Sequence, residues 1–200
     1  MSNTIRVAAI QTKSRCISYK VGGPAAALDA VRGNLDDLCA LAEQAADMAC
    51  DIAAFPEDTL GTLEWESGHW DVAGDLLLPA EEEMLSRLGD VAARREMAIV
   101  CCNDCADGAD IYNTAILIGK DGREAGRYLK VQLPIGEQAR ARGNSFPVFE
   151  VDGIGSVGMC ICYDMVFPET TRALALGGAD IVFHLTMGGA SMAKGDASLA

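Results

Sequence analysis

Short apolar runs that lack polar alternation are the feature of this 200-residue sequence that most restricts its fold. They occur at residues 5–10 (IRVAAI), 51–58 (DIAAFPED), 98–102 (AIVCC) and 178–185 (GADIVFHL). A strand that is covered on only one face alternates apolar and polar side chains, so continuous runs indicate strands that are buried on both faces. Segments with helical spacing of apolar residues separate the runs, and this alternation predicts an α/β fold with helices on the outer faces of the sheets.

Three segments carry helix signals. Asn34 is placed as an N-cap, because acidic residues and then apolar residues at helical spacing follow it. A second helix is expected to start after Pro79 and to end at Arg94 and Arg95, where basic side chains suit the negative end of the helix dipole. A third helix is expected over 168–176, opened by a proline.

Two turn sequences predict β-hairpins, one at residues 120–123 (KDGR) and one at Asp152-Gly153. The second belongs to a G-x-G-x-x-G pattern, which binds dinucleotides only where it follows a strand and opens a helix. Here the glycines lead into an apolar strand, so a hairpin turn is the favoured interpretation. No linker or internal repeat interrupts the chain, and we expect residues 1–200 to form a single domain.

The charge balance excludes two classes of partner. The chain has 29 acidic and 16 basic residues, which gives a formal net charge of −13 at pH 7. Such a surface repels phosphate backbones and anionic lipid, so we expect neither a nucleic acid nor a membrane as partner. No apolar run approaches the ~20 residues that span a bilayer, and the N-terminus lacks a signal-peptide pattern. We therefore expect a cytoplasmic protein whose eight cysteines are thiols.

The cysteines and histidines leave two other chemistries open. Cys101, Cys102 and Cys105 form C-C-x-x-C, but a zinc site needs four ligands and no second pair follows at the usual spacing. Buried, inert thiols are favoured, with a metal or redox site as the alternative. A Cys–His dyad would need His69 or His184. His184 ends a predicted strand, where it is better placed to line a pocket than to act as a base.

Three reactive side chains stand at the ends of predicted strands, where α/β proteins bind ligands. Glu57, Lys130 and Cys162 each follow an apolar run, although a surface turn, a strand-edge lysine and a core thiol would explain them singly. Together they suit acyl transfer: a carboxylate can take the thiol proton, and a lysine can stabilise the thiolate and an oxyanion. The backbone N–H of Tyr163, directly after the cysteine, is a natural second oxyanion donor.

The sequence resembles the nitrilase, or carbon–nitrogen hydrolase, superfamily. The resemblance rests on four motifs in order: VAAIQ (7–11), DIAAFPED around Glu57, YNTAILIGKDGREAGRYLKVQLPIGE around Lys130, and GMCICYDMVFPETTRALALGGADIV around Cys162. It implies that Glu57 is the base, Lys130 the oxyanion stabiliser and Cys162 the nucleophile. It also implies that Glu137 orients the substrate and the lysine.

The resemblance further implies a four-layer α-β-β-α sandwich, a homo-oligomer, and a reaction without metal or cofactor. The expected reaction cleaves a non-peptide carbon–nitrogen bond of a small molecule through a cysteine thioester. The sequence CYD at 162–164 is similar to amidase and carbamoyl-hydrolase branches, so an amide is preferred over a nitrile. Substrate-binding roles are expected for Glu137, Tyr163 and His184.

Two departures keep other interpretations open. Gln132 stands where many relatives have histidine, and relatives continue well beyond residue 200 with strands that complete the second sheet. We therefore expect the fold to be C-terminally incomplete in this chain. The alternatives are a nitrile or N-carbamoyl hydrolase of the same family, and an inactive, truncated relative that acts only as a binding protein.

Overall fold

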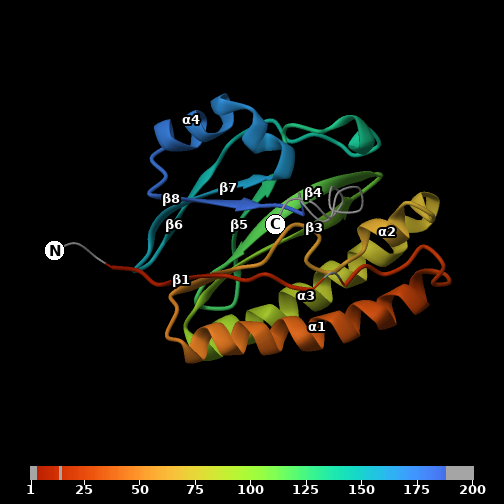
Figure 1. Cartoon of the computed structure of the whole chain (residues 1–200), viewed down its shortest axis with the longest axis horizontal. Helices are drawn as coiled ribbons and strands as arrows, with labels where there is room; N and C mark the ends of the chain where they lie inside the picture. Colours follow the sequence, from red (N-terminus) through yellow and green to blue (C-terminus); the bar gives the residue numbers. More distant parts are fainter. Residues whose placement is uncertain (1–3, 14, 188–200) are drawn as a thin grey trace, which may run out of the picture.

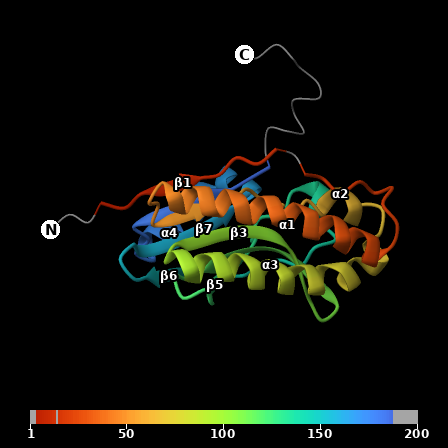
Figure 2. The same ribbon diagram turned by 90° about the horizontal axis from the view of Figure 1, so that it is seen from below.

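The computed structural model describes residues 4–13 and 15–187, and within them two β-sheets lie between layers of helices (Figure 1). Helices α1 (Pro24–Asp47) and α3 (Ala73–Arg95) run side by side across one sheet (Figure 2). Helix α4 (Pro168–Leu176) packs on strand β7 (Gly155–Ile161) of the other sheet. The layers therefore follow the predicted order α-β-β-α.

The strands form one sheet of five and one sheet of three. In spatial order the first sheet contains β1 (Val7–Ala9), β2 (Ile52–Ala54), β3 (Ala98–Asp107), β4 (Asp110–Ile118) and β5 (Glu124–Leu129). The second sheet contains β6 (Val148–Val151), β7 and β8 (Ile181–Leu185). Strands β1 to β3 are parallel, β3 to β5 are antiparallel neighbours, and β7 pairs with β6 antiparallel and with β8 parallel.

Short helical segments complete the described part. These are α2 (Leu63–Glu66) and 3₁₀ turns at Trp70–Val72, Ile135–Glu137 and Cys162–Val166. Within the described ranges no helix combines the length and apolar character that crossing a bilayer requires.

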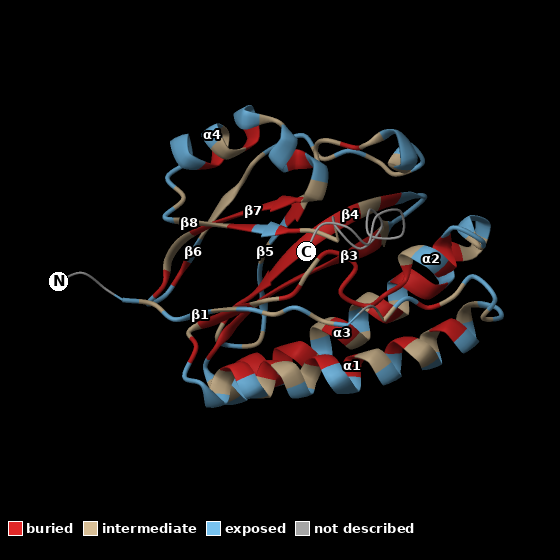
Figure 3. Ribbon diagram, viewed as in Figure 1, coloured by how far each residue is buried: buried red, intermediate tan, exposed pale blue. Residues whose placement is uncertain are grey.

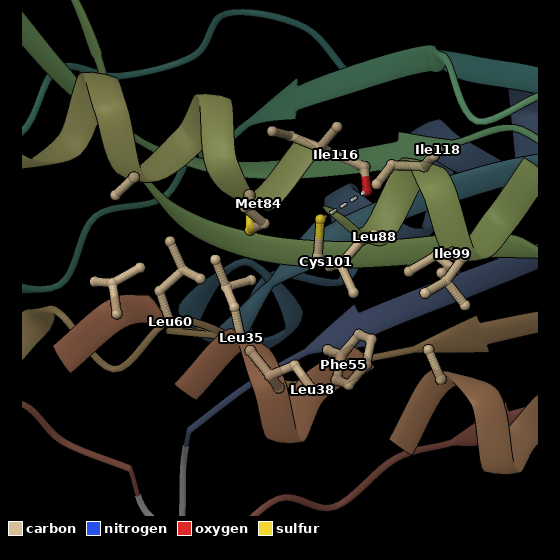
Figure 4. Packing of buried hydrophobic residues seen from close by; sticks show 14 of the residues in the cluster. Leu35, Leu38, Phe55, Leu60, Met84, Leu88, Ile99, Cys101, Ile116 and Ile118 are labelled. Carbon is tan, nitrogen blue, oxygen red and sulfur yellow. Dashed lines mark hydrogen bonds between the residues drawn. The ribbon is translucent and has the colours of Figure 1, made fainter. Parts of the chain in front are cut away.

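The central strands β2, β3 and β4 are largely buried, as the apolar runs at 51–58 and 98–102 predict (Figure 3). The run at 5–10 was wrongly expected to be covered on both faces, because β1 is an edge strand and Val7 is 40% exposed. Alternate residues of β3 take part in different cores. Ile99 and Cys101 pack with α1 and α3 (Figure 4), whereas Val100 and Cys102 pack with residues of the second sheet. The inter-sheet core fixes how the two sheets dock, because each sheet contributes side chains that would otherwise face water.

The glycine pattern at 153–158 forms the predicted hairpin between β6 and β7. Gly153 and Gly155 have positive φ values of 73° and 110°, which other residues adopt at a steric cost. A Cβ on Gly158 would lie 3.1 Å from Leu174 Cδ2, so the glycine allows α4 to approach β7 closely. These glycines therefore serve the turn and the packing of α4.

The predicted start of the first helix is wrong. Helix α1 begins at Pro24, ten residues before the proposed N-cap Asn34. The Asn34 side chain instead donates hydrogen bonds to the carbonyl oxygens of Arg15 (3.0 Å) and Leu60 (2.8 Å). The amide therefore ties two loops to the middle of the helix, a long-range role that mimics a cap signal in the sequence.

The predicted start of the second helix is also wrong. Helix α3 begins at Ala73 and continues through Pro79, although its predicted end at Arg95 is confirmed. Leu76, Leu77 and Ala80, which surround the proline in sequence, are fully buried. Their burial in the core outweighs the backbone hydrogen bond that a proline removes.

Candidate active site

Glu57, Lys130 and Cys162 follow strands whose C-terminal ends meet in space. Strand β4 runs antiparallel to both β3 and β5, and β2 runs parallel to β3. Strands β2 and β5 therefore run in the same direction. The two strands therefore end at the same edge of the first sheet, where Glu57 and Lys130 lie. Cys162 follows β7 of the second sheet, and its thiol interacts electrostatically with both residues.

Lys130 is fully buried between two carboxylates. Its Nζ lies 3.0 Å from Glu57 Oε1 and 2.7 Å from Glu137 Oε2. Burial alone would lower the lysine pKa, but the charges and hydrogen bonds of Glu57 and Glu137 outweigh this effect, and the pKa is raised. The ammonium therefore keeps its charge throughout the neutral range.

The Glu57 carboxylate is held by donors on both oxygens. Oε1 accepts a hydrogen bond from Asn113 Nδ2 (2.8 Å) in addition to the lysine, and Oε2 accepts one from the backbone N–H of Met187 (3.1 Å). Asn113 is itself oriented, because its Oδ1 accepts the S–H of Cys102 at 3.3 Å. This buried carboxylate consequently has one defined orientation next to the thiol.

Cys162 combines partial exposure with an unusual backbone. Its φ is +43°, in the left-handed region that residues with a Cβ seldom adopt. Burial raises the pKa of its thiol, the Glu57 charge raises it further, and a hydrogen bond with Thr186 and the Lys130 charge oppose the increase. The net pKa lies above the ordinary value, so Cys162 is a neutral thiol near pH 7.

Asp164, which the sequence analysis did not single out, joins the cysteine turn to the lysine segment. Its buried carboxylate accepts hydrogen bonds from Ile161 N (2.9 Å), Tyr128 Oη (2.7 Å) and Gln132 N (2.8 Å). Tyr128 and Gln132 flank Lys130 by two residues on either side. Gln132 contributes its backbone N–H to this link.

The three predicted substrate-binding residues lie differently. Glu137 reaches Lys130 and belongs to the buried cluster. The exposed His184 contacts the backbone carbonyl oxygen of Cys162 through Nε2 (3.0 Å). Tyr163 is partly exposed, and its ring packs edge-on against Phe167 at 5.4 Å. The oxyanion role of the Tyr163 backbone N–H stays a prediction.

Two neighbouring cavities lie near the cluster, although Lys130 and Cys162 are among the lining residues of neither. One, of about 240 Å³, lies between Glu57 with its loop (residues 56–59) and the N-terminal segment at residues 11–13. The other, of about 370 Å³, lies between β1 and β8 and is lined in part by His184. Thr186, a partner of the Cys162 thiol, lines both cavities. Of the cluster, only Glu57 therefore lines one of these cavities.

The other cysteines do not form an alternative centre. All eight are free thiols, and within the described ranges no group of three or more His, Cys, Asp or Glu residues could hold a metal ion. Cys101 and Cys102 belong to opposite faces of the first sheet. Burial raises the pKa of Cys101 to about 12 and that of Cys102 and Cys105 well above its ordinary value. They are buried core thiols, and their raised pKa disfavours the reactive thiolate.

The same arrangement of layers occurs in solved structures. An amidase from Nesterenkonia sp. superposes with a TM-score of 0.74 and 25% identity, over 93% of this chain and 66% of that chain. This likeness assigns the chain to the class of nitrilase-fold α/β proteins. The sequence model of the carbon–nitrogen hydrolase family matches residues 6–199, so the chain belongs to that family of hydrolases.

Curated relatives support the same grouping. A nitrilase from Pyrococcus abyssi is 32% identical over 148 residues, which cover 72% of this chain and 55% of the relative. A deaminated glutathione amidase from a Synechocystis strain is 43% identical over 83 residues, which cover 36% of this chain and 30% of the relative. The match to the Pyrococcus protein thus spans about half of its length. The predicted continuation of the second sheet beyond residue 200 stays a prediction.

Proposed function

We propose that this carbon–nitrogen hydrolase cleaves a small-molecule amide through a thioester on Cys162. Glu57 acts as general base, and Lys130 stabilises the oxyanion. The observation that carries the proposal is the ion-pair cluster of Glu57, the fully buried Lys130 and Glu137, next to the partly exposed thiol of Cys162. Buried charges of this kind are costly to a fold unless they are paired, and they concentrate at functional sites.

Acylation begins with proton transfer from the Cys162 thiol to Glu57. The thiolate attacks the amide carbon, and the carbonyl oxygen gains a negative charge that faces the Lys130 ammonium and the backbone N–H of Tyr163. The carbon–nitrogen bond breaks as the nitrogen takes the proton held by Glu57. Ammonia or an amine leaves, and the acyl group remains on sulfur.

Deacylation uses the same base. Glu57 takes a proton from water, and the resulting hydroxide attacks the thioester carbon. The carbon–sulfur bond breaks, the carboxylic acid leaves, and the sulfur recovers its proton. Because the raised pKa keeps Cys162 protonated at neutral pH, the thiol depends on a neighbouring base, and Glu57 is the oriented carboxylate beside it.

Glu137 is proposed to hold the lysine and to orient the substrate. Its contact of 2.7 Å opposes the Glu57 contact on the same Nζ, so the ammonium is fixed between the two acids. His184 is proposed to line the pocket, where it braces the carbonyl oxygen of Cys162. We also propose that the protein works in the cytoplasm and that it is a homo-oligomer. Light scattering on the purified protein would test the oligomeric state.

An amide is the preferred substrate because two of the similar proteins named above are amidases. A nitrile is the second candidate, since the Pyrococcus relative is a nitrilase. The test is ammonia release from a panel of matched amides, nitriles and N-carbamoyl compounds, with Cys162→Ala as control. Release from amides alone, abolished in the control, supports the proposal. Release from nitriles alone would replace the substrate, and release by the control would refute the mechanism.

A further inference from the structure

The segment that carries Glu137 is held by a second buried ion cluster outside the Glu57–Lys130–Cys162 site. Arg140 follows Glu137 by three residues, and its side chain is only 9% exposed. The guanidinium contacts Asp104 of β3 and lies 3.3 Å from Glu66 of α2, and both acids are fully buried. It also lies over the ring of Trp70, 5.3 Å from its centroid.

We propose that Arg140 is the positioning residue that sets the place of Glu137 against Lys130. This proposal rests on the proposed function, because it gives Glu137 a part in catalysis. The backbone N–H of Arg140 donates to the carbonyl oxygen of Glu137 at 3.0 Å, so the two side chains project from one turn. Arg140 anchors one end of this turn in protein, while Glu137 reaches Lys130 from the other.

The rest of the turn has few anchors of its own. Ile135 is 94% exposed, and its neighbours Gly136, Gln138 and Ala139 are also exposed. Gln138 contacts only nearby backbone, through hydrogen bonds to the carbonyl oxygens of Leu133 and Pro134. The backbone N–H of Ala141 also donates to the carbonyl oxygen of Ile111 of β4 (2.8 Å), so the side-chain anchors of the turn itself are Glu137 and Arg140.

The two acids beneath Arg140 require a cation with several donors. Glu66 Oε1 and Asp104 Oδ1 are buried and have no hydrogen-bond partner among the described residues. Burial, and then the charge of Asp104, raise the pKa of Glu66 well above its ordinary value. The raised pKa favours the protonated form of Glu66, so the planar fork of Arg140 mainly balances Asp104. Lysine would supply one charge but not the planar fork.

Hydrogen exchange tests the clamp without a substrate. Arg140→Met is compared with Arg142→Met, a matched change at an exposed residue of the same segment. We expect amides of residues 135–141 to exchange about tenfold faster in Arg140→Met and to be unchanged in Arg142→Met. Equal exchange in the two variants would overturn the proposal. If Arg140→Met does not fold, the triple variant Arg140→Met, Glu66→Gln and Asp104→Asn replaces it, because it removes both acids together with the arginine charge.

A kinetic cycle tests positioning. On an amide that the wild type hydrolyses, Arg140→Met should lower kcat roughly 10–100-fold, while iodoacetamide labels Cys162 at the wild-type rate. If Arg140 acts through Glu137, the double variant with Glu137→Gln is no slower than Glu137→Gln alone. Full additivity would show a merely structural role. A wild type without turnover would refute the proposed function, and the exchange result would still decide the clamp.

Discussion

The Cys162 thiol lies between two groups of opposite charge, and this fixes how its reactivity depends on pH. Glu57 raises the thiol pKa and Lys130 lowers it, against a background of burial that raises it. The thiolate, which is the reactive form, is therefore scarce at neutral pH until a base removes the proton.

Glu57→Gln should lower the pKa of Cys162, because the substitution removes a negative charge and keeps the shape of the side chain. We expect the pH profile of Cys162 alkylation by iodoacetamide to move to lower pH, with site-resolved peptide mass spectrometry as the measurement. Cys39 of α1 is the internal control, and its profile should not change. A profile of Cys162 that stays in place or moves to higher pH would contradict the assigned geometry.

Asp164→Asn should lower the free energy of unfolding by more than the loss of a single hydrogen bond does. Each Asp164 oxygen accepts an N–H, so the amide group of asparagine must face a donor. We expect a loss of roughly 2–4 kcal/mol in the free energy of unfolding. Tyr128→Phe, which removes a single donor to the same carboxylate, should cost about 1 kcal/mol. Urea unfolding measures both, and equal losses would mean that Asp164 is not the link.

Among the secondary-structure elements, the sequence predicted correctly those boundaries that a single proline or glycine determines through its own backbone. Pro168 opens α4 and the hairpin turns fall at 120–123 and 152–153, because proline and glycine restrict the backbone directly. The starts of α1 and α3 were missed because tertiary burial carries those helices past residues that would start or break an isolated helix. Asn34 and Pro79 are the two residues that misled the prediction.

The residues of the candidate site also fall into those that the sequence could identify and those that it could not. Glu57, Lys130 and Cys162 could be selected because each follows an apolar strand and because the surrounding motifs resemble a family. Asn113 and Asp164 could not, since their partners lie 56 and 36 residues away and no local pattern announces such contacts. The only hint in the sequence was the position of Asp164, two residues after the proposed nucleophile Cys162.

Asn34→Ala should destabilise the protein, although alanine favours a helix more than asparagine does. The change leaves the carbonyl oxygens of Arg15 and Leu60 without their side-chain donor. We expect a loss of roughly 1–3 kcal/mol in the free energy of unfolding. Asn144→Ala, at an exposed loop position, is the control and should change it by less than about 0.5 kcal/mol. A neutral or stabilising Asn34→Ala would contradict the role of Asn34 in tying the two loops to the helix.

In the whole molecule, the site depends on the docking of two sheets. Glu57 and Lys130 belong to the first sheet and Cys162 to the second, so the inter-sheet core around Val100 and Met159 sets their relation. Buried acids near this junction also couple stability to pH. Burial raises the pKa of Asp58 from 3.8 to about 7, with smaller contributions from Asp104 and Glu57.

The contribution of Asp58 to wild-type stability should fall as pH rises from about 4 to about 7. The folded protein holds the Asp58 proton more tightly than the unfolded chain does, so ionisation costs up to roughly 4 kcal/mol above the folded pKa and nothing below the unfolded one. Asp58→Asn keeps the acceptor for Thr62 N and Leu63 N and removes this cost. Chemical unfolding across this pH range should show the variant gaining on the wild type. A constant difference between the two would refute the assignment.

The most direct test of the central claim is intact and peptide mass spectrometry of the protein quenched during turnover of an amide. The account predicts an added acyl group on Cys162, absent from the other seven cysteines and from Cys162→Ala, and slow to form in Glu57→Gln. Ammonia release without acylation of Cys162, or turnover that survives Cys162→Ala, would contradict a thioester mechanism at this site.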